Sequence, residues 1–104
     1  MKGMMKMLYP YMTLYFNDEN GIDIVCSDIF HKSNSNKDYI KVYFERVSKD
    51  GQSFDSMNCI LPSLDDGMHD VKGFSEEEAK NHYKKIRHLA TDMIEYVKEE
   101  SHYT

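Results

Sequence analysis

The segment DDGMHD, residues 65–70, holds the densest group of side chains in the sequence that could do chemistry. Its acids and its imidazole have the spacing of an oxygen-rich site for a divalent metal ion, which could then activate water. Acidic loops are more commonly just solvated, so we expect no bound metal and no cofactor. A metal-dependent hydrolase that uses this loop is the alternative. The side chains concerned are Asp65, Asp66, His69 and Asp70, and the three aspartates also form a weak acidic binding group.

The other catalytic patterns that we considered do not occur in the sequence. The five histidines show neither an HExxH motif nor paired ligands on a helix, and there is no glycine-rich phosphate loop and no serine-centred elbow. The two cysteines, Cys26 and Cys59, match no metal or redox spacing and lie in apolar, strand-like segments, which indicates buried thiols. The sequence therefore favours a protein that is not an enzyme.

Tyrosines recur at alternate positions in two strand-like segments, YMTLYF (11–16) and YIKVYFE (39–45). Successive side chains of a strand point to opposite faces, so the tyrosines share one face and the apolar residues share the other. A tyrosine can bury roughly 150–250 Å², so four of them would approach or exceed the largest apolar patch of an ordinary monomer. Cross-strand pairing that only stiffens the sheet is the simpler alternative. We expect a contact surface, the tyrosine face, made of Tyr11, Tyr15, Tyr39 and Tyr43.

Charged residues suggest a second, weaker binding surface. The net charge of −5 disfavours general binding to phosphate backbones, so we do not expect direct binding of nucleic acid. Four cations nevertheless fall within about 60° of one another on a helix that advances 100° per residue, and this basic stripe could meet phosphates or an acidic partner. A solvated helix face is the ordinary explanation. The stripe consists of Lys80, Lys84, Arg87 and Lys98.

These residues would be positioned by a sheet and a helix. Alternating apolar residues predict four strands, and the tight turns Asn20-Gly21 and Asp50-Gly51 and the polar loop 31–38 connect them as an antiparallel meander. Pro62 ends the last strand and a loop follows over 62–73. The predicted strands are 11–16, 22–27, 39–46 and 54–61.

The segment GFSEEEAK predicts the start of a helix. Ser75 is placed as the N-cap, Glu78 completes a capping box, and apolar residues then recur at steps of three and four. The result is one long amphipathic helix that packs on one face of the sheet. We therefore expect an α+β fold in a single domain, 1–104, with a frayed start (1–8), a four-stranded antiparallel sheet (11–61) and a C-terminal helix (75–100).

Location and origin follow from composition. No stretch of 18 apolar residues could span a membrane, and the first residues fail as a signal peptide because Lys6 and Pro10 interrupt the apolar region. We therefore expect a cytoplasmic protein that does not bind membranes. The abundance of Lys, Asn, Ile and Tyr is typical of AT-rich coding sequences, as in many bacteria and phages.

Together these features predict a small acidic, non-enzymatic module that binds another protein. By analogy with other small acidic proteins of AT-rich genomes, we expect an inhibitor or antitoxin-like neutraliser of a bacterial nucleic-acid-acting enzyme, comparable to anti-defence and anti-CRISPR proteins. A homodimer is also compatible with the tyrosine face. The alternatives are the metal-dependent hydrolase described above and a homo-oligomeric structural protein.

Overall fold

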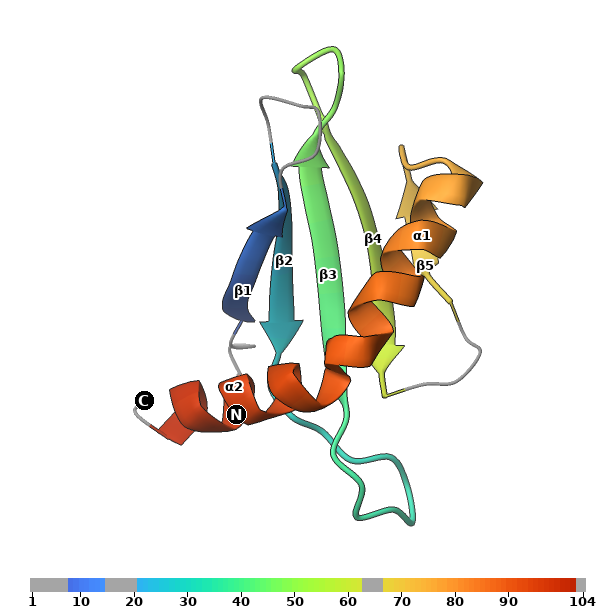
Figure 1. The fold of residues 1–104 in the computed structure, drawn as a ribbon. Coiled ribbons are helices and arrows are strands. Elements are labelled where there is room, and N and C mark those ends of the chain that lie inside the picture. The colour runs from blue at the N-terminus through green and yellow to red at the C-terminus, as the bar shows by residue number, and fades with distance from the viewer. Residues whose placement is uncertain (1–7, 15–20, 63–66, 103–104) are drawn as a thin grey trace.

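The computed structural model of the protein describes residues 8–14, 21–62 and 67–102, which form a sheet followed by a helical segment (Figure 1). Neighbouring strands are antiparallel and follow one another in chain order. The predicted α+β class and the antiparallel sheet with a C-terminal helix packed against it are confirmed. The prediction of four strands is wrong, because the sheet has five: β1 (Leu8–Leu14), β2 (Ile22–Ser27), β3 (Ile40–Val47), β4 (Phe54–Leu61) and β5 (His69–Lys72).

The fifth strand lies in the segment that the sequence predicts to be a loop. Its Lys72 pairs with Ser56 of β4 and its His69 with Asn58, and an irregularity separates the two pairs. Asp70 adopts a left-handed backbone conformation with φ of 52°, and its carboxylate accepts a hydrogen bond from Asn58 at 3.1 Å. All four residues of β5 are exposed. A strand that buries neither face shows no hydrophobic alternation, so β5 has no signal in the sequence.

The first strand begins earlier than predicted and is bulged. Leu8 belongs to β1, although the prediction places it in a frayed end, and the register shifts between Pro10 and Met12. Tyr9 is 5% exposed and donates a hydrogen bond from its hydroxyl to Asp28 at 2.8 Å. Proline within a strand is confined to edges and bulges, and β1 is both an edge strand and bulged.

One face of the sheet carries the hydrophobic core. Every second residue of β2, β3 and β4 is buried, except that Arg46 at the end of this row in β3 is only partly buried. Cys26, Val42 and Cys59 lie side by side across the three strands. The predicted burial of both cysteines is confirmed, since both are free thiols with 0% exposure. Burial raises the pKa of each thiol to about 12, so neither is an available nucleophile near neutral pH.

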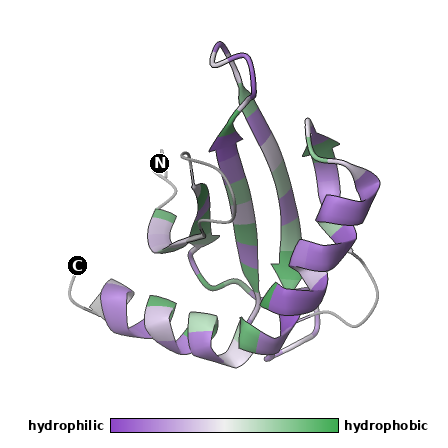
Figure 2. Cartoon of the chain, turned by 45° about the horizontal axis from the view of Figure 1, so that its top comes forward, coloured by the Kyte–Doolittle hydropathy of each residue, from purple (hydrophilic) through white to green (hydrophobic). Residues whose placement is uncertain are grey.

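The C-terminal helical segment covers this core. It consists of α1 (Glu76–Ile86), a short 3-10 turn (Arg87–Leu89) and α2 (Ala90–His102). The chain changes direction at the 3-10 turn, so that α1 runs beside β4 and β5 whereas α2 crosses towards β1 and β2 (Figure 1). The hydrophobic parts of both helices face the sheet (Figure 2). Among the described residues, no helix combines the length and apolar character that a membrane crossing requires.

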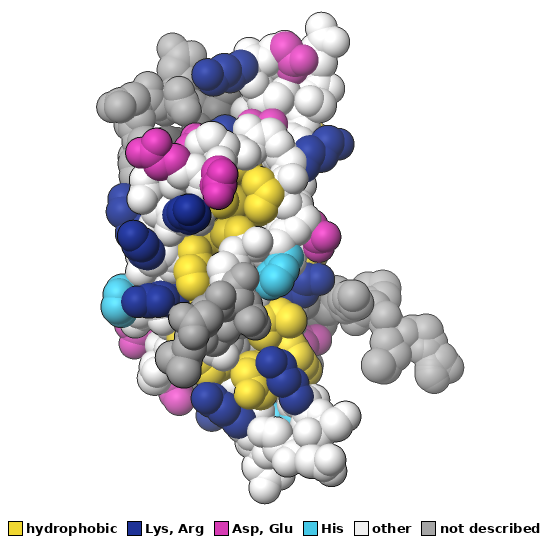
Figure 3. All heavy atoms as spheres, turned by 90° about the vertical axis from the view of Figure 1, so that its right-hand side faces the viewer, with side chains coloured by type: hydrophobic (Ala, Val, Ile, Leu, Met, Phe, Trp, Pro, Cys, Tyr) yellow, Lys and Arg dark blue, Asp and Glu magenta, His cyan; other side chains and the backbone are white. Residues whose placement is uncertain are grey.

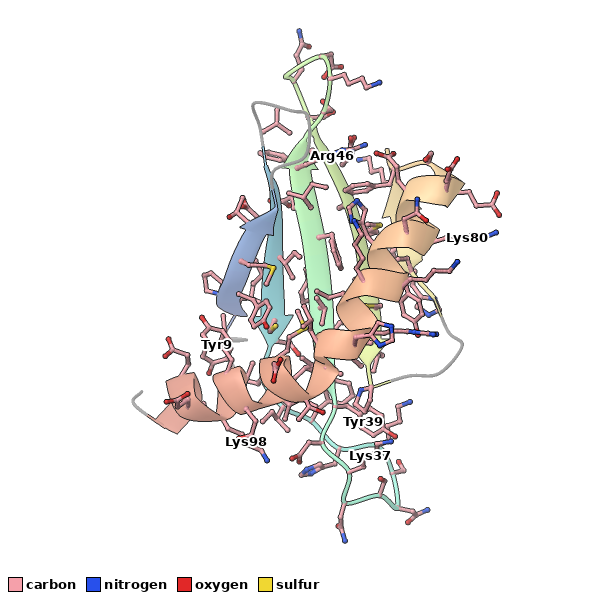
Figure 4. All side chains as sticks on the ribbon, viewed as in Figure 1. Tyr9, Lys37, Tyr39, Arg46, Lys80 and Lys98 are labelled. Atoms are coloured by element: carbon pink, nitrogen blue, oxygen red, sulfur yellow. The ribbon has the colours of Figure 1, made fainter. Side chains whose placement is uncertain are left out.

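Arg46 joins β3 to the start of α1 (Figure 4). Its Nε donates to the carboxylate of Asp55 at 2.8 Å, its Nη1 donates to Glu78 at 2.8 Å, and its guanidinium lies 4.1 Å from the ring centre of Phe74. Gly73 approaches this network so closely that an added Cβ would lie 2.0 Å from Asp55 Oδ1. The network therefore fixes where the helix begins relative to the sheet.

The predicted cap of α1 is present. The Ser75 hydroxyl accepts from the Glu78 backbone N–H at 3.0 Å, and the Glu78 carboxylate accepts from the Ser75 backbone N–H at 2.8 Å. We expect Ser75→Ala to lower the unfolding free energy by about 1 kcal/mol, because the N-cap acceptor is lost. Urea denaturation measures the change. Ser75→Asp keeps an acceptor and should stay within a few tenths of a kcal/mol of wild type; equal losses in the two variants would contradict the cap.

Candidate protein-binding surfaces

The sheet face opposite the helices is not covered by any described element (Figures 1 and 2). Val25, Tyr43 and Asn58 form a row across β2, β3 and β4 on this face, each only partly buried, alternating with the core residues. We call this side the open face. It consists of the outward side chains of the three central strands: Asp23, Val25, Lys41, Tyr43, Glu45, Val47, Phe54, Ser56, Asn58 and Ile60.

The four predicted tyrosines do not share the open face. Tyr43 lies at its centre, with the Nζ of Lys41 5.5 Å from its ring centre. Tyr11 lies on the helix side, where its ring meets Tyr96 of α2 edge-on with centres 5.5 Å apart. The bulge of β1 explains this placement, because it turns Tyr11 towards the same core that Met12 contacts. Tyr15 lies outside the described residues.

Tyr39 lies just before β3, at the base of the 31–38 loop. It exchanges two backbone hydrogen bonds of 2.9 Å with Phe30, and the two rings stack with centres 5.9 Å apart. Lys32 places its Nζ atom 4.5 Å from the Tyr39 ring centre. The Nζ of Lys37 lies 5.9 Å from the same ring (Figure 4). Tyr39 therefore closes a loop, and a continuous patch of four tyrosines is not formed.

Other apolar side chains are exposed on this side of the sheet. Val47 and Phe54 are direct partners at one end of β3 and β4, and they are 37% and 56% exposed. Leu8, paired with Ser27 at the outer end of β1, is 52% exposed. The sequence does not single out these residues by type. Phe54 is three positions from the buried Met57 in the same strand, so alternation alone would have placed the Phe54 side chain on the open face.

Two acids face each other next to Tyr43. Asp23 of β2 and Glu45 of β3 are directly opposite in the register and both are exposed. Thr13 donates a hydrogen bond to Asp23 at 2.9 Å. Like charges directly opposite on neighbouring strands are destabilising, so this pair does not serve the stability of the sheet. It places two negative charges between Tyr43 and the exposed apolar pair, whereas Lys41 is the one cation among the described residues that make up the open face.

The structure separates the predicted basic stripe into two parts. Lys80, Lys84 and Arg87 line a groove of about 610 Å³ between α1 and β5. Lys98 lies on α2, on another side of the molecule from Lys80 (Figure 4), and its Nζ is 3.0 Å from Asp38. That hydrogen bond raises the pKa of Lys98, and the hydrogen bonds of Asp38 with His31 and then with Lys98 lower the pKa of Asp38. The change of direction at the 3-10 turn removes Lys98 from the stripe.

The acidic loop is described only in part. Asp65 and Asp66 lie outside the described residues, and Asp70 is bonded to Asn58 within the sheet. In residues 8–14, 21–62 and 67–102, no group of three or more His, Cys, Asp or Glu side chains could hold a metal ion. The described part of the chain gives the hydrolase alternative no support.

Comparison with known proteins adds no function. No protein-family model, no curated protein and no solved structure matches this chain. The function must therefore be argued from the surfaces themselves.

Proposed function

We propose that the protein is a non-enzymatic module that binds another protein through its open face. The observation that carries the proposal is the like-charged pair Asp23 and Glu45, which lies among Tyr43 and the exposed Val47 and Phe54. Aromatic and apolar side chains supply the desolvated contact of an interface. The acids suit a basic partner, because complementary charge raises the association rate and orients the partner.

The class of partner follows from this charge. Enzymes that act on nucleic acids carry basic surfaces that hold the phosphate backbone, and such a surface matches an acidic, partly apolar face. We therefore propose an inhibitor that occupies the basic surface of such an enzyme. A symmetric dimer through the open face would present two acids and one lysine from each copy and would not supply a strongly basic surface, so it is the less favoured use of the face.

The test starts from a partner captured with the tagged protein in its source cells. Asp23→Asn with Glu45→Gln should slow association and flatten the fall in association rate between about 50 and 200 mM salt, because the attraction is screened over about a Debye length. Tyr43→Ser with Phe54→Ser should instead raise the dissociation rate about tenfold or more, since each 1.4 kcal/mol is tenfold. Surface plasmon resonance separates the two rates.

Two further measurements complete the test. The partner's action on nucleic acid should fall in the presence of wild type and recover with either open-face variant. The double variant Lys32→Ala with Lys37→Ala removes charges at the loop beside Tyr39 and should bind as wild type does. A partner whose binding ignores both open-face variants would overturn the proposal.

A further inference from the structure

The groove between α1 and β5 is a second surface, separate from the open face. Val71 of β5 points to the helix side of the sheet and is 41% exposed, and it lines the groove together with Met68, Ala79 and the ring of Tyr83. The helical side of the groove is lined by three cations, Lys80, Lys84 and Arg87. Viewed from this side, hydrophobic side chains lie between lysine and arginine side chains (Figure 3). The groove therefore combines an apolar floor with a basic rim.

Two of the three cations, Lys80 and Lys84, form no strong ion pair within the described part of the chain. Lys80 is 70% exposed and contacts Glu76 at 3.6 Å, a surface pair that contributes little. Lys84 forms no ion pair with any residue in the described part of the chain. The helix dipole favours Lys84, which lies in the last turn of α1, but it does not account for Lys80 in the first half of the helix. It does not explain the apolar groove beside them.

The spacing of the cations selects the kind of ligand. From Lys80 to Lys84 a helix rises about 6 Å, which is the length of about two residues of an extended peptide. Several acidic groups spread along a chain match this rim, whereas a fatty acid has a single carboxylate. Proteins usually hold single-stranded nucleic acid by stacking its bases on exposed aromatic rings, but Phe74 and Tyr83 in this groove are only 7% and 6% exposed.

The backbone beside the groove is suited to an extended chain. β5 is the last strand of the sheet, and no described strand pairs with its outer edge. Peptides bind such edges by adding a strand, with alternate side chains entering a neighbouring groove. The left-handed conformation of Asp70 limits regular pairing to the end of β5 that contains Val71 and Lys72.

We propose that this groove binds an extended acidic segment of a partner protein, whose apolar side chains lie on the floor and whose carboxylates meet Lys80 and Lys84. The segment is acidic because its charge must complement this basic rim. The site is distinct from the open face and does not depend on the function proposed for it. A protein with both sites could hold two parts of one partner or two different proteins.

A library of short random peptides displayed on phage tests this inference directly. Wild type is the target, and the charge-reversed variant Lys80→Glu with Lys84→Glu is used for counter-selection. We expect the enriched peptides to combine Asp or Glu with large apolar residues. A synthetic, fluorescently labelled copy of one of them should bind the charge-reversed variant at least about tenfold more weakly in fluorescence anisotropy, a loss of 1.4 kcal/mol.

Matched controls locate the site. Lys32→Glu with Lys49→Glu makes the same change in net charge away from the groove and should bind as wild type does, as should Tyr43→Ser. Val71→Ser tests the floor without reversing charge and should also weaken binding. In NMR titration the amide signals of Val71, Lys72 and Lys84 should shift, whereas that of Tyr43 should not. Circular dichroism confirms that each variant is folded.

Four results would overturn the inference. They are a selection that enriches no peptide, a selection that enriches basic peptides, equal weakening by the groove and control variants, and amide shifts confined to the open face. Oleate and a single-stranded oligonucleotide serve as competing probes. Binding of either one in the groove, with no peptide selected, would assign the groove to a different ligand.

Discussion

Replacing Arg46 by methionine should lower the unfolding free energy by roughly 3–5 kcal/mol, the cost of breaking a buried ion pair on one side. Arg46 and Asp55 have side chains that are only 13% and 12% exposed, and their ion pair is 2.8 Å long. Without the guanidinium, the Asp55 carboxylate is left buried with no countercharge, and the start of α1 loses its bond to β3. Urea or thermal denaturation measures the loss.

The sequence contains a matched control for this substitution. Arg87, the second arginine, is exposed on the 3-10 turn, and Arg87→Met should cost less than about 1 kcal/mol because substitutions at exposed positions usually change stability little. Equal losses in Arg46→Met and Arg87→Met would show that the network at the start of α1 does not stabilise the fold.

The pH dependence of stability provides a second readout for the same network. The hydrogen bond from Arg46, and then that from the Ser75 backbone, lowers the pKa of Glu78 from 4.5 to about 2. As the pH falls, the Glu78 carboxylate is therefore protonated in the unfolded chain before it is protonated in the folded protein. The contribution of Glu78 to folding stability is complete above pH 4.5 and is lost as the pH falls towards about 2. Arg46→Met should reduce this loss. If the loss of stability at low pH is the same in Arg46→Met and in wild type, Arg46 is not what lowers the pKa of Glu78.

Ile86→Ala should cost roughly 2–5 kcal/mol, because it leaves a cavity in a packed core. Ile86 is 2% exposed at the end of α1, directly before the 3-10 turn. Glu99→Ala, on the exposed side of α2, serves as the control and should change stability by less than about 0.5 kcal/mol. A loss in Ile86→Ala no larger than that of Ser75→Ala would mean that α1 does not pack on the sheet as described.

The parts of the fold that could be predicted are those that leave a periodic or local signal. β2, β3 and β4 bury one face and therefore alternate, and the helical segment buries one stripe and therefore repeats at steps of three and four. The cap of α1 could be predicted because Ser75 and Glu78 satisfy each other within one turn. Such signals need no knowledge of distant residues.

The parts that could not be predicted depend on residues far apart in the sequence. β5 is recognised only through its pairing with β4, and the 3-10 turn that separates Lys98 from the other cations contains neither Pro nor Gly. Arg46 follows the buried Phe44 by two residues, so the alternation along the strand does predict that this charged side chain points to the core face. Its partner Glu78 is 32 residues away, and the sequence does not connect them.

The tyrosine face shows why a pattern of residue types does not yet define a surface. Alternation places Tyr11 outward only if β1 is regular, but the bulge after Pro10 turns it inward towards Tyr96. Tyr39 alternates as expected, yet its ring stacks on Phe30. What remains of the predicted surface is Tyr43, and its importance comes from neighbours that the sequence does not mark, Asp23 and Phe54.

Photo-crosslinking from position 43 tests the central claim most directly. p-Benzoylphenylalanine replaces Tyr43 in one version of the protein and Glu99, on the exposed side of α2, in another, and both are irradiated in the source cells. We predict a covalent adduct with a single protein from position 43 and none from position 99. Adducts from position 99 with none from position 43 would show that the open face is not the surface by which this protein binds its partner.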